Sequence, residues 1–194
     1  MQETSKSIFF KLKDSRYATR YLIGDGVDIS VDGDYLGQYT EFFPLIQSCR
    51  AWEPSDGNCQ DMASIEDNVF DFVHASYSLQ NLIDAKVGVN NWLRILKPGG
   101  HLICIVPDED LYEQGVFPSN YSFKHKNTFT IYKKSSWSSH SINIFDLIKN
   151  LDYDVEVKKI ELLDSTYRYT SNQRVDQTMT PVGQSAIEFV LRKR

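Results

Sequence analysis

Apolar and polar residues follow two different periods in the middle of the chain. A compact apolar run at 70–75 is followed by a polar stretch, an amphipathic segment at 84–96 and a second apolar run at 102–106. The two runs favour buried strands, whereas apolar positions three to five residues apart are typical of one helix face. Pro-Gly-Gly at 98–100 cannot continue a helix. This pattern predicts a strand, a helix and a parallel strand joined by a right-handed crossover.

The same patterns extend to the rest of the chain. Gly24 and Gly26 end an expected N-terminal helix, and Ser139 or Ser141 caps a later one. In chain order, we expect a helix at 9–23, strands at 26–30 and within 42–52, a helix at 141–151, and strands at 155–163 and 186–191. The last two alternate apolar and polar residues, which predicts an antiparallel hairpin. The loop between them, at 167–183, is long enough to be either functional or mobile.

Length and composition indicate one globular α/β domain. A chain of 194 residues can bury one sizeable core but is short for two domains. Its 41% hydrophobic and 24% charged residues are ordinary for a globular protein. We therefore expect residues 1–194 to form a single domain, with an N-terminal helix within 1–23 and a loop-rich, substrate-side lid at 107–140.

Charge and cysteine content exclude several classes of function. A net charge of -5 argues against broad binding to nucleic-acid phosphates. The three cysteines lack CxxC spacing, so we expect small core residues in a reducing compartment and no metal site. Without an apolar run of 18 residues or a signal-peptide layout, the protein is expected to be cytoplasmic, with no membrane span. The sequence leaves the oligomeric state open.

Two segments resemble those of a known superfamily. Asp-Asn-Val-Phe-Asp-Phe-Val-His-Ala-Ser at 67–76 and Trp-Leu-Arg-Ile-Leu-Lys-Pro-Gly-Gly-His-Leu at 92–102 are similar to the fourth strand, helix and fifth strand of class I S-adenosylmethionine-dependent methyltransferases. Residues 106–115, 136–138, 176–178 and 187–194 resemble a bacterial group of that superfamily often found with glycan-modifying genes. The resemblance implies a Rossmann-like fold and S-adenosylmethionine as the cofactor.

The resemblance also implies where the cofactor binds. After the first strand, the superfamily has an acidic residue and then glycines two and four positions later, where this chain has Asp28, Ser30 and Asp32. We expect the Asp32 carboxylate to repel the cofactor carboxylate. Glu53 either accepts from the ribose hydroxyls, as in the superfamily, or is a solvated carboxylate. Because Asn58 follows so closely, the sheet is expected to be trimmed at this edge. The implied cofactor-binding residues are Asp28, Ile29, Ser30, Glu53, Gly57, Asn58, Cys59, Ala75, Ser76 and Tyr77.

Residues 107–137 carry the expected substrate-side chemistry. Asp108 and Asp110 directly follow the predicted last parallel strand, at the edge where open α/β sheets hold ligands. A carboxylate there, or the imidazole of His125, can take a proton from an attacking hydroxyl, so these are the catalytic candidates. The substrate-side candidates are Glu109, Tyr112, Lys126 and Trp137. Each is otherwise a solvated charge or part of the lid's own core.

Two functions follow. The first is a methyltransferase for a small polar acceptor, for example a sugar hydroxyl, with a small molecule or saccharide as the partner. The alternative is a catalytically inactive methyltransferase-like binding or scaffold domain. In its favour, residues that differ from the superfamily gather on the cofactor side: Ser30, Asp32, Asn58, Tyr77, Gln80 and Asn81. Binding of a dinucleotide is disfavoured, because no GxGxxG precedes a predicted helix.

Overall fold

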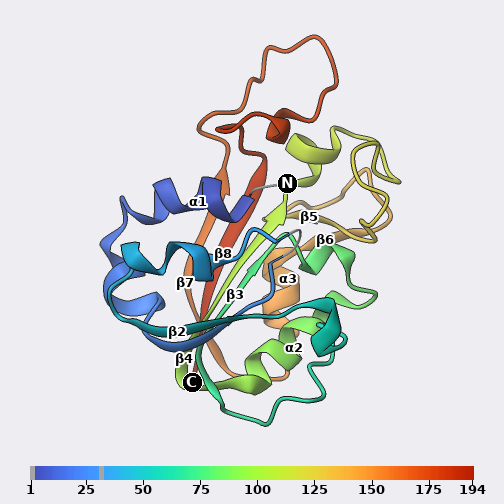
Figure 1. The fold of residues 1–194 in the computed structure, drawn as a ribbon. Coiled ribbons are helices and arrows are strands. Elements are labelled where there is room, and N and C mark those ends of the chain that lie inside the picture. Colours follow the sequence, from blue (N-terminus) through green and yellow to red (C-terminus); the bar gives the residue numbers. More distant parts are fainter. Residues whose placement is uncertain (1–2, 31–32) are drawn as a thin grey trace.

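A mixed sheet forms the centre of the molecule (Figure 1). The structure, a computed structural model, describes residues 3–30 and 33–194. Within these ranges, six strands lie in the spatial order β2 (Ile46–Ala51), β1 (Gly24–Asp28), β3 (Phe70–Ser76), β4 (Leu96–Pro107), β8 (Ala186–Lys193) and β7 (Val155–Leu163). The first four are parallel, and β8 runs antiparallel to both β4 and β7. The predicted α/β fold with its C-terminal antiparallel hairpin is confirmed.

The sheet is trimmed at β2, as predicted. After β2 the chain makes a short turn at Pro54–Asp56, and no strand of the described residues pairs with the outer edge of β2. β2 is accordingly half exposed along its length. This edge leaves the loop at 57–59 close to the ends of β1 and β2.

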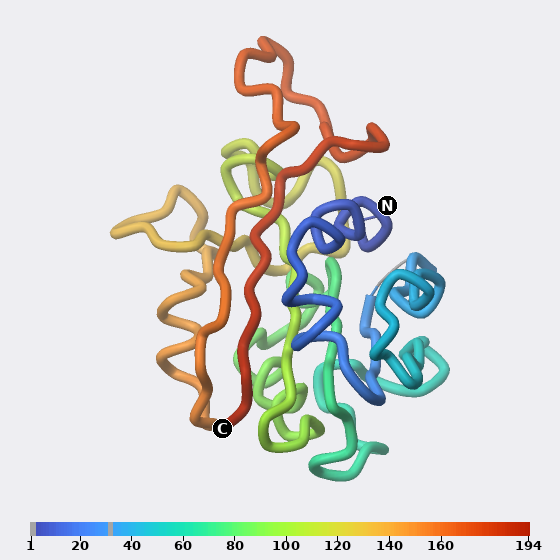
Figure 2. The backbone as a smooth tube through the Cα atoms, turned by 90° about the vertical axis from the view of Figure 1, so that its left-hand side faces the viewer, coloured from blue at the N-terminus to red at the C-terminus, as the bar shows by residue number. Residues whose placement is uncertain are grey.

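Helices cover both faces of the sheet (Figures 1 and 2). α2 (Ala85–Ile95) and α3 (Ile144–Lys149) lie on one face, and α1 (Glu3–Lys11) lies on the other. Asp84 caps α2 by accepting from the Val87 N–H at 3.0 Å, and the helix buries Trp92 and Leu93 completely.

The opposite face packs tightly against the N-terminal segment. Phe72 and Val190 form a buried cluster there with Tyr17 and Leu22. The ring of Phe72 occupies the place where a side chain on Gly26 would lie, since a Cβ there would come within 2.1 Å of it. Glycine is therefore required at this position of β1 for β3 to place Phe72 in the core.

Two predicted helices begin or end elsewhere. The helix expected at 9–23 is replaced by α1 and a separate π-helical turn at Tyr17–Tyr21, because Lys11 and Tyr17 both turn inward to the buried Glu188. The helix expected at 141–151 begins later. The short strand β6 (Ser141–Asn143) pairs with β5 (Thr128–Thr130), and Asn143, not a serine, caps α3.

The loop between β7 and β8 extends beyond the carboxyl edge of the sheet (Figures 1 and 2). It contains a single turn of helix at Gln177–Met179. Among the described helices, none combines the length and apolar composition needed to cross a membrane.

Candidate active site

A cavity of about 550 Å³ lies at the carboxyl ends of β1, β2 and β3. β1 lies between β2 and β3, so successive crossovers leave it in opposite directions, and open α/β sheets bind ligands at such a point. The predicted cofactor residues that line the cavity are Ile29, Ser30, Gly57, Asn58 and Cys59. Asn81, which was expected on the cofactor side, also lines it, as do five residues that the sequence did not single out: Tyr35, Trp52, Pro54, Ser78 and Lys124. Several of these residues are next in sequence to predicted ones, and this proximity could have identified them.

Asp28 shapes the cavity from beneath. Its side chain is fully buried and does not line the cavity. Oδ1 accepts from the Ser30 N–H at 3.1 Å and lies 2.8 Å from Nδ1 of His74, while the Leu36 N–H donates to Oδ2. The carboxylate therefore fixes the start of the loop after β1. His74 gave no sequence signal, because it lies within an apolar strand.

Two indole groups hold the loop at 57–59 in place. Trp52 Nε1 donates to the Gly57 carbonyl at 3.1 Å, and Trp92 Nε1 donates to the Cys59 carbonyl at 2.8 Å. Gly57 has a φ of 118°, a conformation that strains any other residue. Asn58 Oδ1 accepts from the Gln60 N–H at 2.9 Å. The loop is thus a fixed wall that carries backbone and amide groups beside the cavity.

Glu53 lies at the rim. It is exposed and forms the N-cap of the turn at Pro54–Asp56, so it flanks the cavity between Trp52 and Pro54 without lining it. Its predicted contact with a ribose stays a prediction.

The remaining predicted cofactor residues lie apart from the cavity. Ala75 is buried in the core beneath α2, and the buried side chain of Tyr77 packs in a cluster with Tyr112. Ser76 is also buried and does not line the cavity. Asp32 lies outside the described residues, so its expected repulsion of the cofactor stays a prediction.

Glu109 and Asp110 tie the lid to the end of β4. Glu109 is fully buried and accepts from Thr128 Oγ1 at 3.1 Å, Lys133 Nζ at 2.7 Å and Ser136 Oγ at 2.7 Å. Trp137 Nε1 donates to Asp110 at 3.0 Å, and Lys133 pairs with the same carboxylate. These contacts fix the lid's shape.

Asp108 faces a smaller cavity of about 310 Å³ that is also lined by Asp110, Tyr132 and Tyr169. Burial raises the pKa of its carboxyl to about 6, although Oδ1 accepts from the N–H groups of Asp110 and Leu111. A carboxyl with this pKa exchanges protons near neutrality, which suits a general base.

His125 is held by a carboxylate that the sequence analysis did not single out. Its Nδ1 lies 2.6 Å from Oε1 of Glu113, and both side chains are buried. The Tyr112 ring lies against the imidazole, with centroids 5.2 Å apart. Lys126 is exposed, and its backbone N–H donates to the Gln80 carbonyl at 2.8 Å. The structure therefore brings Tyr112 and His125 together but leaves Lys126 at the surface.

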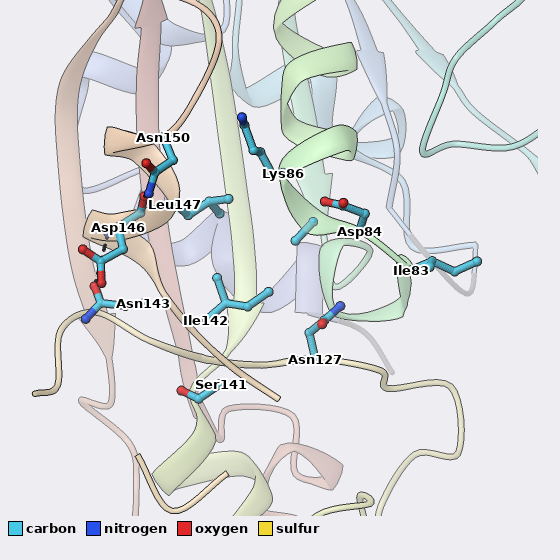
Figure 3. Close-up of a pocket in the computed structure, with 11 residues that line it drawn as sticks. Ile83, Asp84, Lys86, Asn127, Ser141, Ile142, Asn143, Asp146, Leu147 and Asn150 are labelled. Atoms are coloured by element: carbon cyan, nitrogen blue, oxygen red, sulfur yellow. Dashed lines mark hydrogen bonds between the residues drawn. The ribbon is translucent and has the colours of Figure 1, made fainter. Parts of the chain in front are cut away.

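A further cavity of about 470 Å³ lies between α2 and α3 (Figure 3). Its polar side chains already serve the fold. Asp84 and Asn143 cap the two helices, and Asn127 Nδ2 donates to the Leu82 carbonyl at 2.8 Å. It does not lie where the crossovers from β1 diverge, so the cavity at β1 to β3 remains the better candidate for a ligand site.

Comparison with known proteins bears on the fold that carries this cavity. A family model described as a methyltransferase domain matches residues 42–104, from the turn before β2 into β4. The solved structure of an S-adenosylmethionine-dependent methyltransferase from Archaeoglobus fulgidus covers 100% of this chain and 95% of its own, with a TM-score of 0.57 and 10% identity. Residues 42–104 therefore resemble a methyltransferase domain, and the whole chain shares the fold of these solved structures. Several of the matching solved structures, from Archaeoglobus fulgidus and Listeria monocytogenes among others, are of S-adenosylmethionine-dependent methyltransferases.

Other relatives show how far this assignment reaches. Demethylmenaquinone methyltransferases of Bacillus mycoides and Bacillus cereus are 29% identical over 105 residues, which cover 49% of this chain and 42% of theirs. The chain thus spans less than half the length of these curated relatives. The structure of the cyclase SpnF matches with a TM-score of 0.57, 12% identity and 99% of this chain covered. The fold therefore does not fix the reaction by itself.

The residues around the cavity fit an adenosine-bearing cofactor. Its volume is within the range of small-molecule sites, roughly 300–1,000 Å³. Ile29 and Trp52 supply apolar walls, and Gly57 brings backbone to the edge of the cavity. In the described part of the chain, Oδ1 of Asn81 is buried without a hydrogen-bond partner. A buried acceptor of this kind is satisfied by a ligand N–H or by water.

Proposed function

We propose that this protein is an S-adenosylmethionine-dependent methyltransferase that methylates a small polar acceptor. The observation that carries the proposal is the cavity at the carboxyl ends of β1, β2 and β3, at the ligand position of this fold. When bound, the cofactor supplies an electrophilic methyl group on a sulfonium.

Different residues of the chain hold different parts of the cofactor. Ile29 and Trp52 enclose the base, and the amide oxygens of Asn58 and Asn81 accept from its amino group. Glu53, at the rim, accepts from the ribose hydroxyls. Ser30 and the Asp28-bound loop receive the amino-acid end. The lid excludes water from the acceptor side.

On the acceptor side, we assign the general base to His125. Glu113 holds Nδ1 of its ring, which leaves Nε2 to take the proton of the acceptor hydroxyl. Asp108, with its raised pKa, is the second candidate. Alignment of the nucleophile against a reactive methyl group supplies much of the rate acceleration.

Two lines of similarity suggest what the acceptor is. The sequence resemblance favours a sugar hydroxyl, and the curated relatives are named for demethylmenaquinone. The lid carries exposed aromatic rings, Tyr132 and Trp137, that suit stacking on a sugar face. An acceptor screen therefore begins with neutral glycosides and includes demethylmenaquinone.

Calorimetric titration with S-adenosylmethionine and S-adenosylhomocysteine tests the proposal. Micromolar binding is expected, and Asn81→Ala should weaken it about tenfold, since an amide acceptor to a buried donor is worth about 1.4 kcal/mol. Asn90→Ala is the matched control, because Asn90 pairs with Asp152 outside the cavity. Asp32→Gly should tighten binding. No binding at millimolar ligand would favour the inactive binding or scaffold domain.

A further inference from the structure

Several fully buried polar atoms near the lid have no partner or only one another. Within residues 3–30 and 33–194, the Tyr112 hydroxyl and the Oε2 atom of Glu113 have no hydrogen-bond partner, and the hydroxyls of Tyr77 and Ser185 have at most each other. These residues are at most 2% exposed. Native proteins pair nearly all buried polar groups, so a group of unpaired ones in one place indicates a missing ligand or water.

These side chains belong to one site at the carboxyl edge of the sheet. Tyr77 follows β3, Ser185 precedes β8, and Tyr112 and Glu113 lie in the turn after β4. The ring centroids of Tyr77 and Tyr112 are 6.1 Å apart, and Tyr112 stacks beside His125, which Glu113 holds. We call Tyr77, Tyr112, Glu113, His125 and Ser185 the tyrosine chamber.

The roof of the chamber comes from segments far apart in the sequence. Glu3 and Lys6 of α1 form an ion pair at 2.9 Å, and Lys6 Nζ also donates to the carbonyl of Thr178 in the loop before β8. Gln114 Nε2 donates to the Val175 carbonyl of the same loop at 2.8 Å. The chamber is therefore closed by α1 and by the long loop that extends beyond the sheet.

The chamber shares its walls with the cofactor cavity. Ser78 lines the cavity, and the preceding residue, Tyr77, packs into the chamber. On the other wall, Thr4 donates to Ser30 Oγ at 3.2 Å, next to Glu3 in α1. Two sites that adjoin in this way can place an acceptor against a methyl donor.

The charges around the chamber are negative. Burial, and then the carboxylates of Glu3 and Asp176, raise the pKa of both phenol groups, so the hydroxyls remain neutral hydrogen-bond donors. The ammonium of Lys6 is already occupied by Glu3 and by Thr178. A phosphate or carboxylate on the acceptor would meet the carboxylates of Asp176 and Glu113, while the Lys6 ammonium is already paired with Glu3.

We propose that the tyrosine chamber is the methyl-acceptor site and that it takes an uncharged, hydroxyl-bearing molecule. This rests on the proposed function. The acceptor's polar groups pair with the hydroxyls of Tyr77 and Tyr112, and Glu113 positions His125. The acceptor O–H gives its proton to His125 Nε2 while its oxygen forms the new C–O bond. The methyl carbon's bond to sulfur breaks, and that electron pair stays on sulfur.

Thermal unfolding of the ligand-free protein tests whether the chamber is a site or part of the core. Tyr112→Phe removes an unpaired hydroxyl, and Tyr77→Phe removes one whose nearest partner is the Ser185 hydroxyl, so each should leave Tm unchanged or raise it by about 2–4 °C. Tyr17→Phe is the matched control. Its buried hydroxyl bonds to Glu188 and accepts from Lys159 Nζ at 3.2 Å, so this variant should lower Tm. A fall in Tm for both chamber variants, equal to that of the control, would overturn the proposal.

Turnover is the second measurement, made with whichever acceptor the screen identifies. Tyr77→Phe and Tyr112→Phe should each lower kcat/KM at least tenfold with unchanged affinity for S-adenosylhomocysteine. Glu113→Gln should lower kcat more than it raises KM, and Glu113→Asp should restore part of it. Full turnover in the tyrosine variants, or equal kcat/KM for a glycoside and its phosphorylated form, would refute the chamber. If the wild-type protein does not bind S-adenosylhomocysteine, the proposed function is refuted instead.

Discussion

Two polar clusters lie on one face of the sheet beneath α1, and they differ in how fully their atoms are paired. Alternate residues of β8 point to the same face of the sheet, so Glu188 and Ala186 lie next to each other on that face. In the first cluster, Lys11 donates to Glu188 Oε2 at 2.7 Å, and Lys159 donates to Glu188 Oε1 at 2.9 Å. In the tyrosine chamber, around Ala186, the described residues offer the Tyr112 hydroxyl no partner and the Tyr77 hydroxyl at most that of Ser185.

The difference in pairing distinguishes a cluster that serves the fold from one that is suited to binding a ligand. Burial alone would raise the pKa of Glu188, but Lys11 and Lys159 outweigh it and lower the pKa to about 2. The cluster is complete without a ligand, and it joins α1 to the C-terminal hairpin. The chamber has similar burial but leaves the Tyr112 hydroxyl and Glu113 Oε2 without a partner, so the fold bears the cost of desolvating them. A site whose polar groups are left for a ligand has this property.

The largest expected effect comes from breaking the paired cluster. Glu188→Gln leaves Lys11 buried without a countercharge, so unfolding free energy should fall by about 3–5 kcal/mol in urea titrations. Glu161→Gln is the control. This carboxylate also pairs with Lys159 but is half exposed, so its loss should cost less than about 1 kcal/mol. Equal effects of the two variants would remove the distinction between the buried cluster and an ordinary surface ion pair.

The contributions of the two clusters to stability should depend on pH in opposite directions. Burial outweighs Lys6 and raises the pKa of Glu3, at the roof of the chamber, from 4.5 to about 7. The folded state then holds a proton that the unfolded state releases, so stability falls as pH rises from 4.5 to 7, by about 3 kcal/mol at most. Glu3→Gln should abolish this slope in denaturation at pH 5 and pH 8.

Glu188 should act in the opposite direction. Its lowered pKa means that its contribution is present above pH 4.5 and is lost as pH falls toward 2. Acid unfolding of Glu188→Gln should therefore lack this component. A Glu3→Gln protein that keeps the wild-type slope between pH 5 and pH 8 would show that the roof carboxylate is solvated.

The smallest expected effect concerns the cofactor cavity. Trp52→Phe keeps an aromatic wall but removes the N–H that Trp52 donates to the Gly57 carbonyl at 3.1 Å. Affinity for S-adenosylhomocysteine should fall about fivefold, equivalent to about 1 kcal/mol, because the loop at 57–59 loses one of its two indole bonds. If calorimetry gives wild-type affinity while Tm falls, this bond belongs to the fold and not to the site.

Local pattern was sufficient for the central unit. The period of apolar residues and the Pro-Gly-Gly stop identified β3, α2 and β4, and alternation identified β7 and β8. The short spacing between Glu53 and Asn58, compared with the helix that the resembled superfamily has there, predicted the trimmed edge at β2. These features depend on neighbours along the chain, which the sequence displays directly.

The cavity was predicted only in part, for a related reason. Ile29, Ser30 and the loop at 57–59 follow strands whose carboxyl ends must meet at one edge. The sequence could not show that Asp28 would turn beneath the cavity toward His74. It also could not show that Tyr77 would leave the cofactor side, because side-chain direction at a strand end depends on what packs above it.

The sequence by itself determined the fold class, the hairpin and the edge of the sheet where ligands bind. Only the tertiary structure decided which polar groups are paired. Lys11 and Glu188 lie 177 residues apart, and Glu113 meets His125 across a lid with no regular period. Pairing of buried charges depends on distance and desolvation in three dimensions, and hydrophobic periodicity carries no record of either.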